Sequence, residues 1–164
     1  MTPSADPNAQ TGAKADREPA FTTADRQAWM GLLARATPAR LAELFPDLPP
    51  HSLLRPPEIG AVMVQGRTGG TGQPFNLGEM TVTRCALRLA TGALGHAHVQ
   101  GRDKTHALRA AALDALLQTD QDATLRARIL HPLQAEENAR RTTRAAKAAA
   151  TRVEFFTLVR GEDK

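Results

Sequence analysis

The chain has 164 residues, which fits one domain with a modest core. Its formal net charge of +4 is compatible with acidic partners or nucleotides and does not by itself indicate nucleic-acid binding. The single cysteine, Cys85, excludes an internal disulfide framework and favours a reducing, cytoplasmic location, and no apolar run approaches the roughly 20 residues of a membrane span.

The first part of the chain is predicted to be a disordered tail over residues 1–21, because it is rich in Pro, Ala and Asp and has no helical or strand period. One domain is expected over residues 22–164. It is predicted to begin with a helix capped by Thr22 or Thr23, followed by a short helix with Pro38 at its first position. The first helix has apolar side chains at helical spacing on its buried face, namely Trp29, Leu33 and Ala36.

The middle of the chain is predicted to form an antiparallel sheet around a glycine-rich loop. A strand around residues 53–54 is expected to stop at Pro56-Pro57, because proline cannot continue a central ladder. Residues 62–64 predict a short buried strand before the loop, and residues 80–89 predict a strand after it whose side chains alternate between two faces.

A hairpin is predicted next, with Thr91-Gly92 as a two-residue turn and a returning strand over residues 94–100. This turn fixes the register, which places Leu89 opposite Leu94, Leu87 opposite His96, and Cys85 opposite His98. Cys85, His96 and His98 would then converge as metal ligands, but a fourth ligand is lacking and such residues are more often polar positions on a strand face. We therefore predict no metal site, and we interpret Cys85 as unreactive packing.

The last part of the chain is predicted to be helical. Asp103 is expected to cap a helix that covers the sheet, and a later helix is expected to end at His131-Pro132. Residues 133–151 are rich in Ala, Arg and Lys, which predicts a helix that is either solvated or packed on another subunit. Residues 153–159 favour a strand. The predicted fold class is α+β: an antiparallel sheet, made of a central hairpin plus the glycine-rich loop, covered by helices, with a long C-terminal Ala/Arg-rich helix.

The glycine-rich stretch is the strongest candidate for ligand binding. Gly69 and Gly70 permit backbone conformations that a side chain would forbid, and they follow Arg67. Arg84 lies on the next predicted strand, and Arg102 precedes the covering helix. Glycines beside arginines can receive phosphate, although a flexible connection with solvated charges is the commoner use of such a stretch.

Known nucleotide and catalytic motifs do not match this stretch or the rest of the chain. A Walker loop would need a lysine and a following helix, and a dinucleotide fingerprint would also lead into a helix, whereas a strand is predicted here. The serines, Ser4 and Ser52, lie on no nucleophile elbow. We predict no catalytic residue in this chain.

Five strings in order resemble one family. They are residues 26–30 (RQAWM), 67–72 (RTGGTG), 81–84 (TVTR), 99–107 (VQGRDKTHA) and 155–161 (FFTLVRG). This pattern resembles the PhnG family, the small subunit of the bacterial carbon–phosphorus lyase core complex, and the resemblance runs from about residue 25 to residue 164. Relatives in this family often have aromatic residues where this chain has His96 and His98, a difference that weakens the metal interpretation further.

The resemblance implies a role in organic phosphonate catabolism, in a complex with the companion subunits H, I and J. With MgATP as substrate, the first step in that family displaces adenine from the nucleotide and attaches the phosphonate to ribose, giving ribose methylphosphonate triphosphate. Chemistry is assigned to the I subunit for that step and to the radical iron–sulfur J subunit for cleavage of the carbon–phosphorus bond. The resemblance thus implies an accessory subunit without a cofactor of its own.

Two functional hypotheses follow. In the first, this chain is an accessory subunit, and Arg67, Gly69, Gly70, Arg84 and Arg102 are candidates for phosphate binding or for stabilising the assembly. In the alternative, the chain is a stand-alone nucleotide- or phosphate-binding module that uses the glycine-rich loop. Nucleic-acid binding is disfavoured because aromatic stacking platforms are scarce, with one Trp, five Phe and no Tyr.

Overall fold

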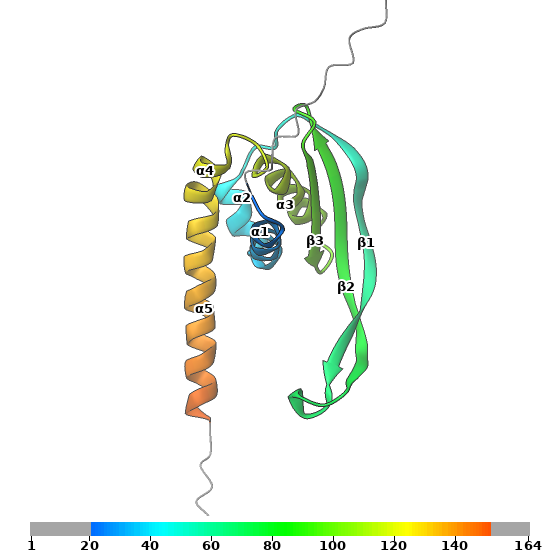
Figure 1. The fold of residues 1–164 in the computed structure, drawn as a ribbon, viewed down its shortest axis with the longest axis vertical. Helices are drawn as coiled ribbons and strands as arrows, with labels where there is room; N and C mark the ends of the chain where they lie inside the picture. Colours follow the sequence, from blue (N-terminus) through cyan, green and yellow to red (C-terminus); the bar gives the residue numbers. More distant parts are fainter. Residues whose placement is uncertain (1–20, 152–164) are drawn as a thin grey trace, which may run out of the picture.

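The computed structural model describes residues 21–151, and Figure 1 shows their arrangement. The elements in chain order are α1 (Thr23–Arg35), α2 (Pro38–Leu44), β1 (His51–Arg67), a 3₁₀ turn η1 (Thr68–Gly70), β2 (Pro74–Leu89), β3 (Leu94–Gln100), α3 (Lys104–Leu116), α4 (Asp122–Leu125), a π-helical segment η2 (Arg126–Leu130) and α5 (His131–Ala150). Nearly all of the predicted tail, and the strand predicted for residues 153–159, lie outside the described residues.

Within residues 21–151 the strands form one antiparallel sheet in the order β1-β2-β3. Helix α3 packs across this sheet, α1 lies against α3 and β3, and α2 lies against α3. The predicted α+β class and the long Ala/Arg-rich helix are confirmed. Beyond β3, strands β1 and β2 pair only with each other over residues 61–81, which we call the arm. Figure 1 shows the arm and α5 extending in the same direction on opposite sides of α1.

The sheet and α3 make a core of mostly small and aliphatic side chains. The alternation predicted for β2 is confirmed, because Cys85, Leu87 and Leu89 are buried on the face toward α3. The side of α3 facing them is rich in buried alanines, so the helix approaches the strands closely. At Gly95 of β3 an added Cβ would stand 1.9 Å from the carbonyl oxygen of Ala111, so the close approach requires glycine there.

The hairpin between β2 and β3 has a different register from the predicted one. The Leu89 backbone N–H donates to the Ala93 carbonyl oxygen at 2.9 Å, which closes a three-residue turn over residues 90–92. Gly92 ends this turn with φ of 89°, the left-handed conformation typical of three-residue hairpin loops. The extra residue shifts every pair by one, and the observed partners are Arg88 with Leu94, Ala86 with His96, and Arg84 with His98. The predicted register is therefore wrong.

Strands β1 and β2 are both longer than expected. The two short segments predicted around 53–54 and 62–64 belong to the single strand β1, which contains Pro56 and Pro57. Proline is tolerated because β1 is at an edge of the described sheet, and the register shifts between Leu53 and Arg55 and between Arg55 and Glu58 mark bulges at these residues. Since β2 begins at Pro74 rather than near residue 80, the glycine-rich loop shrinks to residues 68–73.

The helix starts follow the predicted caps, but one predicted helix end is wrong. Thr22 caps α1 in a capping box with Asp25, and the Asp103 side chain caps α3. The helical segment does not end at His131-Pro132 as predicted. Pro132 instead lies in the first turn of α5, which follows η2 directly. Proline is tolerated in the first turn of a helix, where its missing N–H needs no acceptor. Within residues 21–151 no helix is long and apolar enough to cross a membrane.

The buried carboxylate of Asp114, near the C-terminal end of α3, joins the helices to the sheet. It is fully buried and accepts four hydrogen bonds. Arg26 of α1 donates two of them, from Nε at 3.1 Å and Nη2 at 2.7 Å, and this bond raises the pKa of the Arg26 guanidinium above its ordinary value. Trp29 Nε1 and the His96 backbone N–H donate the others, each at 2.9 Å.

These contacts also protect the free side of β3, which is an edge strand of the described sheet. The His96 N–H points outward to Asp114, and the Leu94 carbonyl oxygen accepts from Gln118 Nε2 at 2.8 Å. The Trp29 ring lies 5.0 Å beneath the Arg126 guanidinium of η2, so the same residue connects α1 to the start of the C-terminal helical segment. The string at residues 26–30 therefore has a structural role.

Replacing Asp114 by alanine should lower the free energy of unfolding by about 3–5 kcal/mol, because it leaves the Arg26 charge and two further donors without their acceptor. The measurement is urea denaturation followed by circular dichroism. Asp120→Ala, at an exposed position outside this network, is the control and should change stability by less than about 0.5 kcal/mol. Equal effects of the two substitutions would contradict the role of the network.

Candidate functional site

The predicted glycines lie at the tip of the arm, where the chain turns from β1 into β2. Gly69 and Gly70 have φ of 58° and 84°, so the turn requires residues that tolerate the left-handed region. Nothing stands within 4 Å of the position that a Cβ would take on either residue, which leaves the tip open to an approaching molecule. Arg67 is exposed beside them, and its Nη1 donates to the Gly72 carbonyl oxygen at 3.2 Å.

Arg84 lies on β2, on the face opposite Cys85. Its Nη2 donates to Glu58 Oε1 at 2.9 Å, and Gly60 beside it leaves room for the guanidinium. The Nε of Arg84 is buried and has no acceptor among the described residues. An unsatisfied buried donor costs about 1–3 kcal/mol, and because this nitrogen is enclosed by the protein it offers no contact to a bound molecule; the exposure of the Arg84 side chain, 42%, comes from its other atoms.

The predicted arginines do not form one cluster. Arg67 pairs with Pro74, which is ten residues from Arg84 along β2. At about 3.3 Å per residue, the two positions are separated by about 30 Å. Arg102 is exposed in the turn that precedes α3. Arg67 and Arg84 therefore belong to different parts of the surface, which suits contacts with a large partner better than joint binding of one phosphate.

Cys85, His96 and His98 are not brought together either. In the observed register Cys85 pairs with Ala97 on the buried face, whereas His96 and His98 are exposed and alternate with that face. Burial raises the pKa of the Cys85 thiol, which disfavours the reactive thiolate. Among residues 21–151 no group of three His, Cys, Asp or Glu side chains is placed to hold a metal ion.

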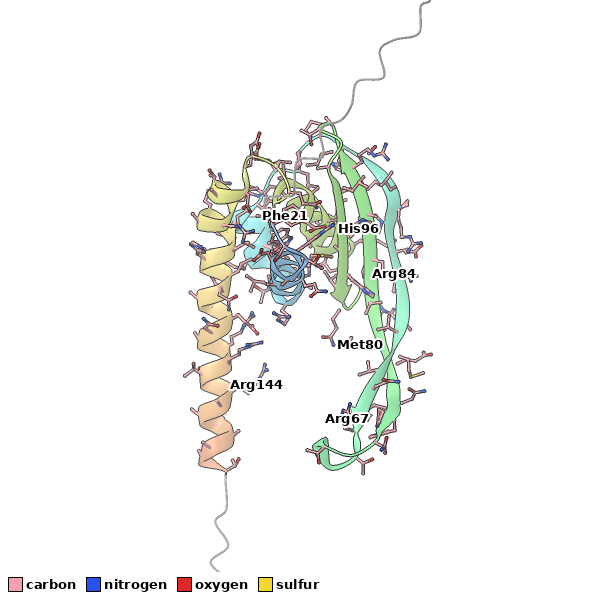
Figure 2. The ribbon with its side chains drawn as sticks, viewed as in Figure 1. Phe21, Arg67, Met80, Arg84, His96 and Arg144 are labelled. Atoms are coloured by element: carbon pink, nitrogen blue, oxygen red, sulfur yellow. The ribbon has the colours of Figure 1, made fainter. Side chains whose placement is uncertain are left out.

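The sequence did not reveal a groove of about 630 Å³ between the helices and the arm. Its walls come from the end of α1, the base of the arm and the middle of α5, and His98 and His106 also line it. Figure 2 shows Met80 extending from β2 and Arg144 extending from α5 into the space between these elements. Val62 and Val82 add apolar surface on the side of the strands.

Glu137 is the centre of a charge cluster on the α5 side of this groove. Its Oε2 accepts from Arg140 Nη2 at 2.8 Å, and its Oε1 accepts from Arg141 Nε at 3.2 Å, with Arg35 Nε at 3.7 Å. Burial opposes ionisation of this carboxyl, but the hydrogen bonds and charges of Arg140 and Arg141 outweigh it and hold the pKa of Glu137 below its ordinary value. The cluster joins α5 to the C-terminal end of α1.

His106 is a buried residue at the inner end of the groove. Its Nε2 donates to the Leu33 carbonyl oxygen of α1 at 2.8 Å, which assigns the Nε2–H tautomer, and its backbone N–H donates to Asp103 Oδ1 at 2.8 Å. These bonds fix the first turn of α3 against α1. The groove therefore has an inner end fixed by hydrogen bonds, one charged wall and one apolar wall.

The contribution of Glu137 to stability should depend on pH. Because its pKa is lower in the folded chain than the ordinary value of 4.5, the ionised carboxylate stabilises the fold above about pH 4.5. This stabilisation is lost as the pH falls through the depressed folded-state pKa. Urea denaturation should show Glu137→Gln less stable than the parent at pH 7, with the difference shrinking below pH 4.5. Glu79→Gln, at an exposed position on the arm, is the control; a difference independent of pH would contradict this account.

Comparison with known proteins bears on the identity of the chain. The family model described as "Phosphonate metabolism protein PhnG" matches residues 24–161. A relative from Rhizobium meliloti (strain 1021), the alpha-D-ribose 1-methylphosphonate 5-triphosphate synthase subunit PhnG, is 45% identical over 143 residues, which cover 85% of this chain and 92% of the relative. Since both matches span most of the chain, it belongs to the PhnG family.

Proposed function

We propose that this chain is an accessory subunit of the carbon–phosphorus lyase core complex in organic phosphonate catabolism. In this role it is required when the complex uses MgATP to displace adenine by phosphonate and form ribose methylphosphonate triphosphate. Its partners would be the companion subunits H, I and J, and it would contribute no catalytic residue. We expect the complex to work in the cytoplasm, where MgATP is available. The name of the Rhizobium meliloti relative, a synthase subunit, supports this proposal.

The structural observation that carries the proposal is the exposed apolar surface of β1 and β2. Six large side chains on these strands are between 45% and 66% exposed: Leu53, Leu54, Ile59, Met63, Phe75 and Leu77. A two-stranded ribbon is at best marginally stable in water, and clustered exposed apolar side chains mark interaction surfaces. Contact with companion subunits would remove these side chains from water and hold the arm in one conformation.

The assembly itself provides the first test. The four subunits are co-expressed and purified, and the release of adenine from MgATP in the presence of methylphosphonate is followed by chromatography. We expect omission of this chain to reduce turnover to background, because the complex would lack a required part. Full turnover by the other three subunits would contradict the proposal.

The alternative function, a stand-alone nucleotide-binding module, predicts a different result for the isolated chain. If the chain is an accessory subunit, isothermal titration calorimetry of the isolated chain with MgATP should show no micromolar binding. The reason is that Gly69 and Gly70 form a turn between two strands, whereas phosphates are commonly held at the start of a helix. Micromolar binding by the chain alone would favour the alternative.

The predicted arginines are tested separately within the complex. Arg67→Glu and Arg84→Glu should each lower complex yield or synthase turnover. The first reverses a charge at the open tip of the arm, and the second places a carboxylate beside Glu58 and removes a partly exposed guanidinium. Arg128→Glu, at an exposed position on η2, is the matched control. Yield and turnover equal to the control for both variants would remove these residues from the proposal.

A further inference from the structure

The arm and the second half of α5 are two projections that the core does not support. All residues of α5 from 138 onward are exposed, and Met63, Phe75 and Leu77 of the arm are at least 45% exposed. The two projections extend in the same direction (Figure 1), and residues near the base of both line the groove. A lone helix and a two-stranded ribbon both depend on contacts with other elements for most of their stability. A molecule bound between α5 and the arm would supply such contacts to both.

The two walls of the groove differ in chemistry. Val62, Met80 and Val82 give the strand side an apolar surface. On the helix side, both oxygens of Glu137 are occupied by Arg140 and Arg141. Beyond Glu137, helix α5 has cationic side chains and no acidic one, since Arg140, Arg144 and Lys147 follow at spacings of four and three residues and so share one face.

Arg144 and Lys147 have no anionic partner among the described residues, whereas the other cations of the cluster contact Glu137. The wall of α5 therefore presents uncompensated positive charge to whatever enters the groove. An occupant that satisfies both walls must combine acidic side chains on one side with apolar side chains on the other.

Two other occupants fit less well. A second copy of this chain would bring a net charge of +4 against the same sign of charge on α5. A phosphate or nucleotide would find the α3 N-terminus already capped by the negatively charged Asp103, and it would face aliphatic rather than aromatic side chains on the strand wall. An amphipathic polypeptide segment remains as the occupant that complements both walls.

We infer that the arm and α5 close around one segment of a companion protein, which places acidic side chains against Arg144 and Lys147 and apolar side chains against Val62 and Met80. This inference rests on the proposed function, since the segment belongs to a protein of the same complex. The groove is thus a clamp for a partner segment, and the arm gains from it the cover that a two-stranded ribbon lacks.

Charge reversal tests the α5 wall. The double variant Arg144→Glu/Lys147→Glu changes two exposed side chains that make no hydrogen bond among the described residues, so folding should be retained. The control, Lys104→Glu/Arg128→Glu, makes the same change in charge at exposed positions that lie outside the groove and outside the apolar surface of β1 and β2. We expect the affinity for the co-purified companions to fall about tenfold or more for the groove variant, and to change little for the control. Equal affinities for the two variants would overturn the inference.

Photo-crosslinking tests whether one segment contacts both walls. Benzoylphenylalanine replaces Met80 on the arm in one preparation, and in another it replaces Ala148, which lies one turn beyond Arg144 on the same face of α5. Mass spectrometry of the assembled complex should find both probes attached to one stretch of one companion, containing acidic and apolar residues. Attachment to different stretches, to a second copy of this chain, or to nothing would overturn the inference.

Two further outcomes separate this inference from the proposed function. If MgATP abolishes the Met80 crosslink while the complex stays intact, the groove binds nucleotide and the clamp is wrong. If the parent chain assembles and supports adenine release but the groove variant matches the control, the proposed function stands and the clamp alone fails. If the parent chain does not associate with the companions, both fail.

Discussion

The carboxylate of Asp114 is the point where α1, α3 and β3 meet. A buried charge is tolerated only when donors surround it, and Arg26, Trp29 and the His96 N–H supply four hydrogen bonds from two other elements. The core beside it consists largely of Leu and Ala, which provide few shape constraints on how a helix lies over a sheet. The directional bonds to Asp114 supply that constraint and fix the position of α1. At the C-terminal end of α1, Arg35 lies 3.7 Å from Glu137 of α5 and so links that helix to α1.

The remaining surface follows from where this helical layer ends. Helix α3 covers β3 and the adjoining parts of β2 and β1, and no described helix continues over the arm. Side chains that alternate along a strand become buried on one face only where another element packs against that face. Because no described helix packs against the arm, its apolar side chains, such as Met63 and Leu77, remain exposed to water. On the other side, α5 loses contact with α1 after the Glu137 cluster, and from there its side chains are small or cationic. Both projections are thus consequences of a core that stops early.

Sequence patterns predicted what depends on neighbouring residues and missed what depends on distant ones. The caps Thr22 and Asp103, and the alternation along β2, are local and were confirmed. The hairpin register failed because two-residue and three-residue turns differ only in the backbone of residues around Gly92. The role of Asp114 depends on Arg26, 88 positions away, although one signal was available: a carboxylate flanked by apolar residues on a covering helix must find donors. The candidate arginines were chosen because they lie beside glycines or in strings that resemble the family, and neither feature indicates that Arg67 and Arg84 lie far apart on a long ribbon.

An accessory role is consistent with where the buried hydrogen-bonded groups of this chain lie. Active sites need several groups held at fixed distances by a surrounding shell, and in this chain the most constrained polar groups, Asp114, His106 and Glu137, have their hydrogen bonds directed at the backbone and side chains of neighbouring elements. The hydrogen bonds of these three side chains hold the helices in place. What is left for other molecules is an extended surface with apolar and cationic parts, and such a surface recognises a partner by shape and charge over many residues. Because the helical layer ends before the arm, Met63, Phe75 and Leu77 remain exposed, and a partner that covers them would add apolar burial that the core of this chain does not supply.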